Sequence, residues 1–218
     1  MENSALHYSE RGFDVTKESD RYYFVYGMRF EKDRKYTYED YKQLPETMRV
    51  DLIDGVFYEK YPIDPEISLA APSRAHQTLV LELGRAIGNY IAEKNGSCKV
   101  YVAPFSVRLT EDDKNAVEPD VSVICDPSKL TEEGCNGAPD WIIEVLSPTT
   151  ASNDYVRKLN KYMDAGVREY WIVDPEGKRV SVYEFGQGNT VQKQYSFEDN
   201  IKAGIYEDLF IDLSTISI

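Results

Sequence analysis

The sequence predicts an α/β sandwich in which helices flank a mixed central sheet. Its 218 residues correspond to about one large domain. Two long segments have helical periodicity, and short apolar runs between and after them have the composition of strands. The resulting order of helix, three strands, helix and strand is typical of a sheet covered by helices.

The N-terminal part of the chain divides into two segments. Residues 1–35 are charged and rich in tyrosine without a clear period, so we treat them as an extension of uncertain structure. The domain itself is expected to span residues 36–218. Within it, Thr37 can cap a short helix from Tyr38 to about Leu44, and Pro45 ends that helix.

A hairpin and a long helix follow. Arg49–Tyr61 is predicted to form the hairpin, because apolar residues flank the turn Asp54-Gly55, a strong type I′ signal. Pro62–Pro72 is a predicted loop. Ser73 can then cap a helix over Arg74–Glu93, whose apolar stripe consists of Leu79, Val80, Leu83, Ala86, Ile87, Tyr90 and Ile91.

Most of the predicted strands lie in the remaining part of the chain. Three follow the long helix, at Lys99–Leu109, Pro119–Cys125 and Trp141–Leu146. Asn153 can cap a second helix over Asp154–Ala165, which Gly166 ends. A further hairpin pairs Glu169–Asp174 with Arg179–Phe185, and a last strand covers Thr190–Ser196.

Composition excludes several classes of protein. Lys and Arg total 25 and Asp and Glu total 38, so the net charge of −13 argues against a histone-like nucleic-acid binder. The first 30 residues are too charged for a secretory signal, and no apolar run is long enough to span a membrane. With three cysteines and two histidines, structural zinc or a disulfide framework is not expected. We expect a soluble, cytoplasmic protein with reduced thiols.

Glu144 is the most informative single residue. It interrupts Trp141-Ile-Ile-Glu-Val-Leu146, a run that is otherwise apolar on both faces and therefore typical of a central strand. A carboxylate in that position must be paired, protonated or bound to a metal. The alternatives are a functional acid and a structural one held by Arg or Tyr.

Asp120 lies at the start of the preceding strand. By itself it is compatible with an ordinary salt bridge in a loop. If the two strands are neighbours, however, Asp120 and Glu144 point into one small volume, where like charges repel. A hard divalent cation, which takes oxygen ligands, removes that repulsion.

These residues carry a resemblance to a known group of enzymes. Pro119-Asp120 followed by Glu144 resembles the motif of the PD-(D/E)XK nuclease superfamily and, more closely, a restriction-endonuclease-like family called Uma-two. The resembling segments span about residues 37–213: Leu52–Gly55, His76, Pro119–Val121, Ile143–Pro148, Asp154, Lys158, Tyr162, Gly166-Val167, Glu169–Asp174 and Asp208–Leu213. The resemblance implies a restriction-endonuclease-like sandwich with added β-hairpins.

The chain departs from the superfamily motif at one position. The motif places a lysine two residues after the acid, on the same face of the strand, and here that residue is Leu146. The family resemblance implies that Lys158 on the following helix replaces it. Lys158 lies about 105° from the centre of the apolar stripe of that helix, and Lys161 about 165° away. Lys158 is therefore the candidate, and Lys161 should face water; an ordinary surface lysine is the alternative for Lys158.

Two residues of the first long helix are further candidates. His76 lies within roughly 20° of the centre of the apolar stripe, so it is either a core histidine or, as the resemblance implies, an active-site residue. Glu82 lies at the edge of the stripe, and some members of the superfamily use an acid from this helix as an extra metal ligand.

The implied function is Mg²⁺-dependent cleavage of DNA. Asp120 and Glu144 would hold Mg²⁺, with Mn²⁺ as a substitute, and Lys158 would orient the attacking water. Many such nucleases are homodimers, and we expect the same here. The main alternative is a non-catalytic nucleic-acid-binding or regulatory module on a nuclease fold, which the acidic surface favours. A glycoside hydrolase using the two acids has no further support.

Overall fold

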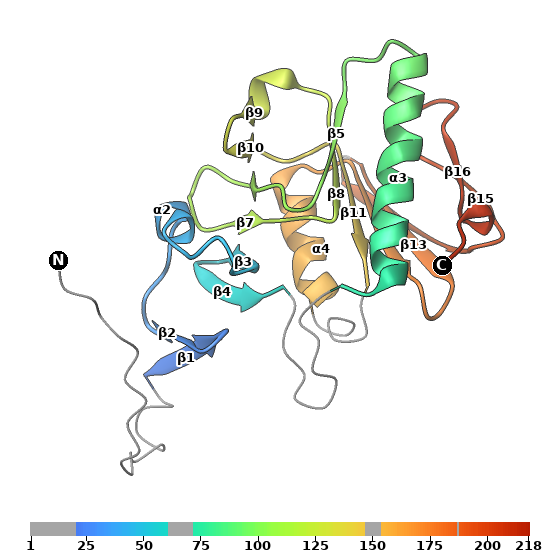
Figure 1. The fold of residues 1–218 in the computed structure, drawn as a ribbon. Coiled ribbons are helices and arrows are strands. Elements are labelled where there is room, and N and C mark those ends of the chain that lie inside the picture. Colours follow the sequence, from blue (N-terminus) through green and yellow to red (C-terminus); the bar gives the residue numbers. More distant parts are fainter. Residues whose placement is uncertain (1–20, 61–71, 147–153, 187) are drawn as a thin grey trace.

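A computed structural model describes residues 21–60, 72–146, 154–186 and 188–218 (Figure 1). Two six-stranded sheets make up most of the described structure, and two small two-stranded sheets accompany them. The predicted mixed α/β class is confirmed.

The main sheet has the strand order β14-β13-β12-β11-β8-β5. Only β11 and β12 are parallel among these neighbours, so the sheet is mixed, as predicted. The two long helices, Arg74–Glu93 and Asp154–Ala165, pack on opposite faces of this sheet. The strands cover Lys99–Val102 (β5), Val121–Ile124 (β8), Trp141–Val145 (β11), Glu169–Asp174 (β12), Arg179–Gly186 (β13) and Asn189–Ser196 (β14).

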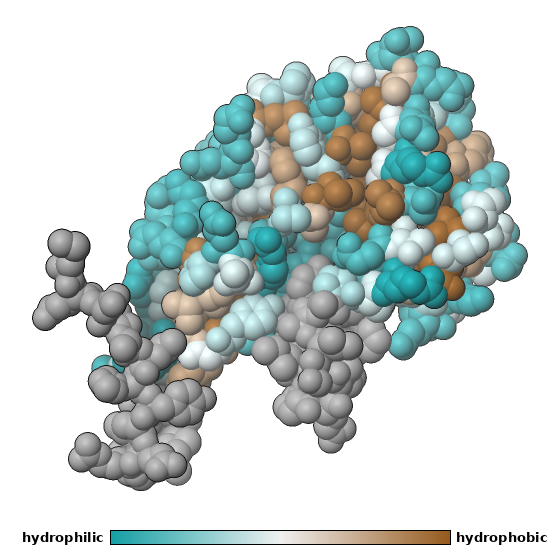
Figure 2. All heavy atoms as spheres, in the orientation of Figure 1, coloured by the Kyte–Doolittle hydropathy of each residue, from teal (hydrophilic) through white to brown (hydrophobic). Residues whose placement is uncertain are grey.

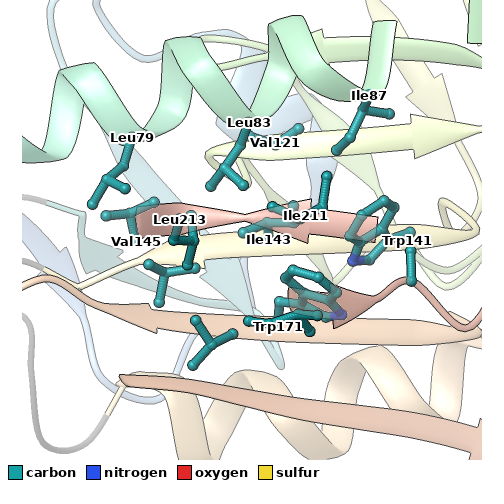
Figure 3. Close-up of a cluster of buried hydrophobic side chains, with 14 of the residues drawn as sticks. Leu79, Leu83, Ile87, Val121, Trp141, Ile143, Val145, Trp171, Ile211 and Leu213 are labelled. Atoms are coloured by element: carbon teal, nitrogen blue, oxygen red, sulfur yellow. The ribbon is translucent and has the colours of Figure 1, made fainter. Parts of the chain in front are cut away.

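Helix α3 (Arg74–Glu93) covers one face of this sheet. Its N-cap is Ser73, whose hydroxyl accepts a hydrogen bond from the backbone N–H of His76. The predicted apolar stripe of α3 packs on the inward side chains of β8 and β11 (Figure 3), among them Leu79, Leu83, Ile87, Val121, Ile143 and Val145. Burial of this stripe, rather than helix propensity alone, holds α3 on the sheet.

Helix α4 (Asp154–Ala165) covers the opposite face. Its buried Tyr162 packs against Ile142, Tyr170 and Ile172, which alternate along β11 and β12 with the residues under α3. The predicted cap of α4, Asn153, lies outside the described residues.

The second sheet packs into the same core as α4, and its strand order is β4-β3-β7-β6-β10-β9. The strands cover Val50–Ile53 (β3), Val56–Glu59 (β4), Val107–Arg108 (β6), Ala116–Val117 (β7), Leu130–Thr131 (β9) and Gly134–Asn136 (β10), with a 3-10 turn η1 at Pro127–Lys129. The predicted hairpin is confirmed as β3–β4, and its turn has positive φ angles at Asp54 and Gly55, as type I′ requires.

One strand prediction is wrong. Lys99–Leu109 is not a single strand, because the chain leaves the main sheet after Val102 and joins the second sheet as β6. Pro104 lies at this break, and proline cannot donate a ladder hydrogen bond. The short strands β7, β9 and β10 were not predicted, since two or three residues show no period.

Smaller elements lie at the two ends of the described chain. Tyr22–Val25 (β1) and Met28–Glu31 (β2) form a hairpin within residues 1–35, and aromatic contacts join it to β4. Tyr38–Lys42 (α2) is the predicted short helix with its Thr37 cap. Asn200–Lys202 (β15), Phe210–Asp212 (β16) and the 3-10 turn Leu213–Thr215 (η2) complete the core beneath α3.

Two features concern the environment of the protein. Cys98 and Cys125, expected to be reduced, form a disulfide, whereas Cys135 is a buried free thiol. The expectation of reduced thiols is therefore wrong for this pair, which the pairing of β5 with β8 brings together. In the part of the chain described here, no helix is both long and apolar enough to cross a bilayer.

Candidate active site

Asp120 and Glu144 are brought together by the pairing of β8 with β11. The strands are antiparallel, with Val121 opposite Ile143. One further step in the same register sets Asp120 opposite Glu144, and opposed residues of antiparallel strands share a face of the sheet. Both side chains are buried, with 2% and 7% of their surface exposed. The expectation that the strands of Asp120 and Glu144 are neighbours is therefore confirmed.

Glu144 is held by two residues of α4. The Lys158 ammonium donates to Glu144 Oε1 at 3.0 Å, and the Tyr162 hydroxyl donates to the same oxygen at 2.9 Å. Residues four apart on a helix share a face, which explains why both reach one carboxylate. Lys158 also lies 2.7 Å from Oδ2 of Asp51, so one buried cation bridges two acids.

Asp120 is held from three directions. Its Oδ2 lies 3.1 Å from Nε2 of His76, in the first turn of α3, and accepts a hydrogen bond of 2.8 Å from the backbone N–H of Val145. Its Oδ1 lies 3.0 Å from the ammonium of Lys60, just after β4. The site therefore draws on α3, α4, β8, β11 and the β3–β4 hairpin.

Three members of this cluster were not predicted: Asp51, Lys60 and Glu118. Asp51 Oδ1 accepts from the backbone N–H of Glu118 at 3.1 Å, and Lys60 donates to the Glu118 carbonyl. Asp51 interrupts the fully buried strand β3, so it gives the same signal as Glu144 and could have been found. Lys60 follows an ordinary hairpin strand, and nothing local distinguishes it.

The surroundings move the pKa values of the two central acids in opposite directions. Burial favours the neutral form of Asp120, but the charge of Lys60 and the contact with His76 outweigh it and hold the Asp120 pKa below its usual value. Burial raises the pKa of Glu144; the charge of Lys158 opposes this rise, and the charge of Asp120 adds to it. Paired acids with separated pKa values are typical of catalytic sites.

Two residues considered as site candidates or alternatives in the sequence lie outside this cluster. Glu82, considered as an extra ligand, forms an ion pair with Arg85 one turn along α3, and no described contact links it to the cluster. Lys161 lies near the surface and pairs with Asp54 at 2.6 Å. Lys158, in contrast, is 3% exposed and is not an ordinary surface lysine.

The cluster has the chemistry to hold a hard cation, although it does not form a complete cage. Among the described residues, no group of three or more His, Cys, Asp or Glu side chains could hold a metal ion. Mg²⁺ nevertheless needs only one or two carboxylates, because it keeps several waters. Buried Glu118 Oε2 accepts no hydrogen bond from the described residues, and Asp120 Oδ1 faces the Lys60 cation. Asp120 and Glu144, which lie opposite each other on neighbouring strands, fit Mg²⁺ at a position where the Lys60 ammonium now neutralises Asp120.

A cavity of about 610 Å³ opens on one side of the cluster. Asp120, Lys60, His76 and Glu118 are among the residues that line it, so a ligand in the cavity could approach Asp120. A volume of this order is typical of small-molecule and cofactor sites.

Comparisons with known proteins concern the family and the fold. A family model described as "Uma2: Putative restriction endonuclease" matches residues 38–213. The uncharacterized protein slr1290 of Synechocystis sp. is 24% identical over 148 residues, which cover 66% of this chain and 72% of that protein. A crystal structure described as a putative nuclease belonging to DUF820, from Anabaena variabilis, superposes with a TM-score of 0.64 at 20% identity, over 82% of this chain and 95% of that one. The fold is thus that of a restriction-endonuclease-like sandwich.

Proposed function

Since the chain belongs to the Uma2 family of putative restriction endonucleases, we propose that it is a metal-dependent nuclease that hydrolyses phosphodiester bonds of DNA. The observation that carries this proposal is the contact of 3.0 Å between Lys158 and Glu144, next to Asp120 on the neighbouring strand. Two acids and one amine in a single buried cluster are what metal-assisted phosphodiester hydrolysis requires.

Asp120 and Glu144 would hold the metal, and Mg²⁺ bound there would supply positive charge that polarises the scissile phosphate. Lys158 holds the Glu144 carboxylate in place and adds a second positive charge next to the phosphate. His76 and the backbone N–H of Val145 fix the orientation of Asp120. Tyr162 acts in the same way on Glu144 as a positioning residue.

A cleavage assay tests this proposal. Purified protein should cut DNA in Mg²⁺ or Mn²⁺ and stop in chelator. Asp120→Asn, Glu144→Gln and Lys158→Met should each lower the rate by about 100-fold or more, the scale of losing one preorganised electrostatic group. Lys161→Met is the matched control, because it removes an ammonium from the same helix that pairs with surface Asp54.

Wild-type protein that is inert on duplex, single-stranded and branched DNA in either metal would contradict the proposal. A Lys161→Met variant as impaired as Lys158→Met would also count against the assigned role of Lys158.

A second candidate function is a non-catalytic module that binds nucleic acid. The observation that favours it is the mutual neutralisation of the cluster, in which Lys158 pairs with Asp51 and Glu144, and Lys60 pairs with Asp120. Such ion pairs can stabilise a fold without taking part in catalysis. A gel shift with DNA at low salt, in protein that shows no cleavage, would support this function instead.

We also propose that the protein is a homodimer, as many nucleases of this superfamily are. Light scattering coupled to size-exclusion chromatography measures the mass directly. A mass of 25.0 kDa, that of one chain, would contradict the dimer.

A further inference from the structure

The lining of the cavity beside Asp120 contains two chemically different groups of residues. One group consists of three cationic side chains and two carboxylates: Arg49, Lys60, Arg74, Glu118 and Asp120. The other group is apolar and consists of Val80, Leu81, Val102, Ala103 and Pro104. We call the exposed pair Leu81 and Val102, together with Pro104, the apolar shelf.

The shelf exposes large aliphatic side chains on neighbouring elements. Leu81 is 63% exposed on α3, and Val102 is 42% exposed at the end of β5. Helix α3 and strand β5 pack closely against each other. A Cβ added at Gly84 of α3 would come within 2.9 Å of Val102 on β5. Figure 2 shows hydrophobic residues gathered on this face, over α3 and β5. Apolar side chains exposed within a cavity are typical of a binding groove.

We propose that this cavity accepts one unpaired nucleotide of the substrate strand, with its phosphate beside the charged lining residues and its base on the apolar shelf. This inference rests on the proposed function and specifies its substrate class. Lys60 pairs with Asp120 and Arg49 lies 3.6 Å from Glu118, so Arg74 is the excess positive charge in this lining that a phosphate requires, although the whole chain carries −13. Asp120 lines the same cavity, so a phosphate bound there lies near the proposed metal ligand.

The apolar shelf determines which form of DNA can bind. In an intact duplex each base is stacked and paired, and bringing one onto the shelf costs the free energy of unstacking it. In a single strand, an overhang or a flap that cost is largely absent. The preferred substrates are therefore single-stranded DNA and duplexes with unpaired ends, rather than blunt duplexes.

A binding experiment on the full-length protein tests this without relying on catalysis. Fluorescence anisotropy is measured in chelator with a labelled single-stranded oligonucleotide and with a blunt duplex of the same sequence. We expect the single strand to bind at least about ten-fold more tightly, because only its bases are free to leave the stack. The double variant Leu81→Ser/Val102→Ser should lose about ten-fold in affinity for the single strand and none for the duplex, since a polar shelf no longer buries a base.

Phe210→Ser is the matched control, because Phe210 is an equally exposed apolar residue on β16, outside the residues that line this cavity. It should leave both affinities unchanged. Thermal unfolding checks that each variant is folded; if the double variant is not, the two single substitutions serve instead, each with a loss of about three-fold in single-strand affinity, half of the double-variant effect on a logarithmic scale.

Equal affinity of the wild type for single strand and duplex would overturn the inference. Unchanged single-strand affinity in the shelf variant would overturn it as well. Protein that cuts blunt duplexes and single strands equally well retains the proposed nuclease function and loses only this substrate class. Protein that cuts nothing, yet binds single strands through the shelf, loses the nuclease function and keeps the cavity assignment.

Discussion

Seven acidic or basic side chains share the buried cluster, namely Asp51, Lys60, His76, Glu118, Asp120, Glu144 and Lys158. Burying a charge is costly unless it is paired, and a well-packed apolar cluster is often as stable as the buried ion pairs it replaces. The cluster is therefore poorly explained by stability alone. Asp120 and Glu144 have shifted pKa values, and such groups beside a cavity are typical of functional sites.

Asp120→Asn should destabilise the metal-free protein in a pH-dependent way. It leaves the buried Lys60 ammonium without its carboxylate, which we expect to cost about 3 kcal/mol at pH 7. The Asp120 pKa is lowered on folding, so its contribution is present above the ordinary value of about 3.9 and is lost as pH falls toward the folded pKa. Urea unfolding in chelator between pH 3 and pH 7 measures the difference from wild type, which should shrink below about pH 4.

The exposed Asp126 provides a control for this measurement. Its pKa is lowered mainly by hydrogen bonds from Ser128, without burial. Asp126→Asn should therefore have a much smaller effect than Asp120→Asn. A difference between wild type and Asp120→Asn that stays constant down to pH 3 would show that pairing with Lys60 does not stabilise the ionised form.

At the scale of elements, the close packing of α3 on β5 depends on two glycines. A Cβ at Gly84 would lie 2.9 Å from Val102 Cγ1, whereas one at Gly88 would lie 3.3 Å from Val100 Cγ1. Replacing a helical glycine by alanine gains about 1 kcal/mol of helix propensity. Overpacking a stiff, β-branched neighbour costs about 1–3 kcal/mol.

We therefore expect the two alanine substitutions to differ. Gly84→Ala should lower the free energy of unfolding by about 1 kcal/mol, because the clash exceeds the gain in propensity. Gly88→Ala should stay within about 0.5 kcal/mol of wild type, since a shift of a few tenths of an ångström relieves its contact. Urea denaturation measures both. A Gly84→Ala protein more stable than wild type would mean that β5 moves away freely.

At the scale of the whole molecule, the Cys98–Cys125 disulfide closes a loop with a sequence separation of 27 residues. The entropy of closing this loop predicts that reduction lowers the free energy of unfolding by about 3.5 kcal/mol. Urea unfolding with and without reductant measures this, and the double variant Cys98→Ser/Cys125→Ser should not respond to reductant. Alkylation of all three cysteines in unreduced, denatured protein would show that the bond does not form. Disulfides are typical of oxidising compartments, whereas the cytoplasmic location stays a prediction from sequence.

The sequence by itself determined the α/β class, the long helix, the β3–β4 hairpin and the choice of Asp120 and Glu144 as candidates. The helix, the hairpin and Glu144 follow from local patterns: a helical stripe, a turn with Gly at the required position, and an acid inside an apolar strand. Each of these signals depends on neighbours within a few residues. Asp120 has no such local signal, and its choice depended on the expected pairing with Glu144 and on the family resemblance.

Only the tertiary structure decided what surrounds those two acids. Lys60 meets Asp120, and Asp51 meets Lys158, across sheets and layers formed by segments far apart in the chain. The break after Val102 and the joining of Cys98 to Cys125 likewise follow from which strand lies beside which. The physical reason is that strand register and helix packing are set by burial of the whole core, and a side chain's partners across that core leave no trace in its own local sequence.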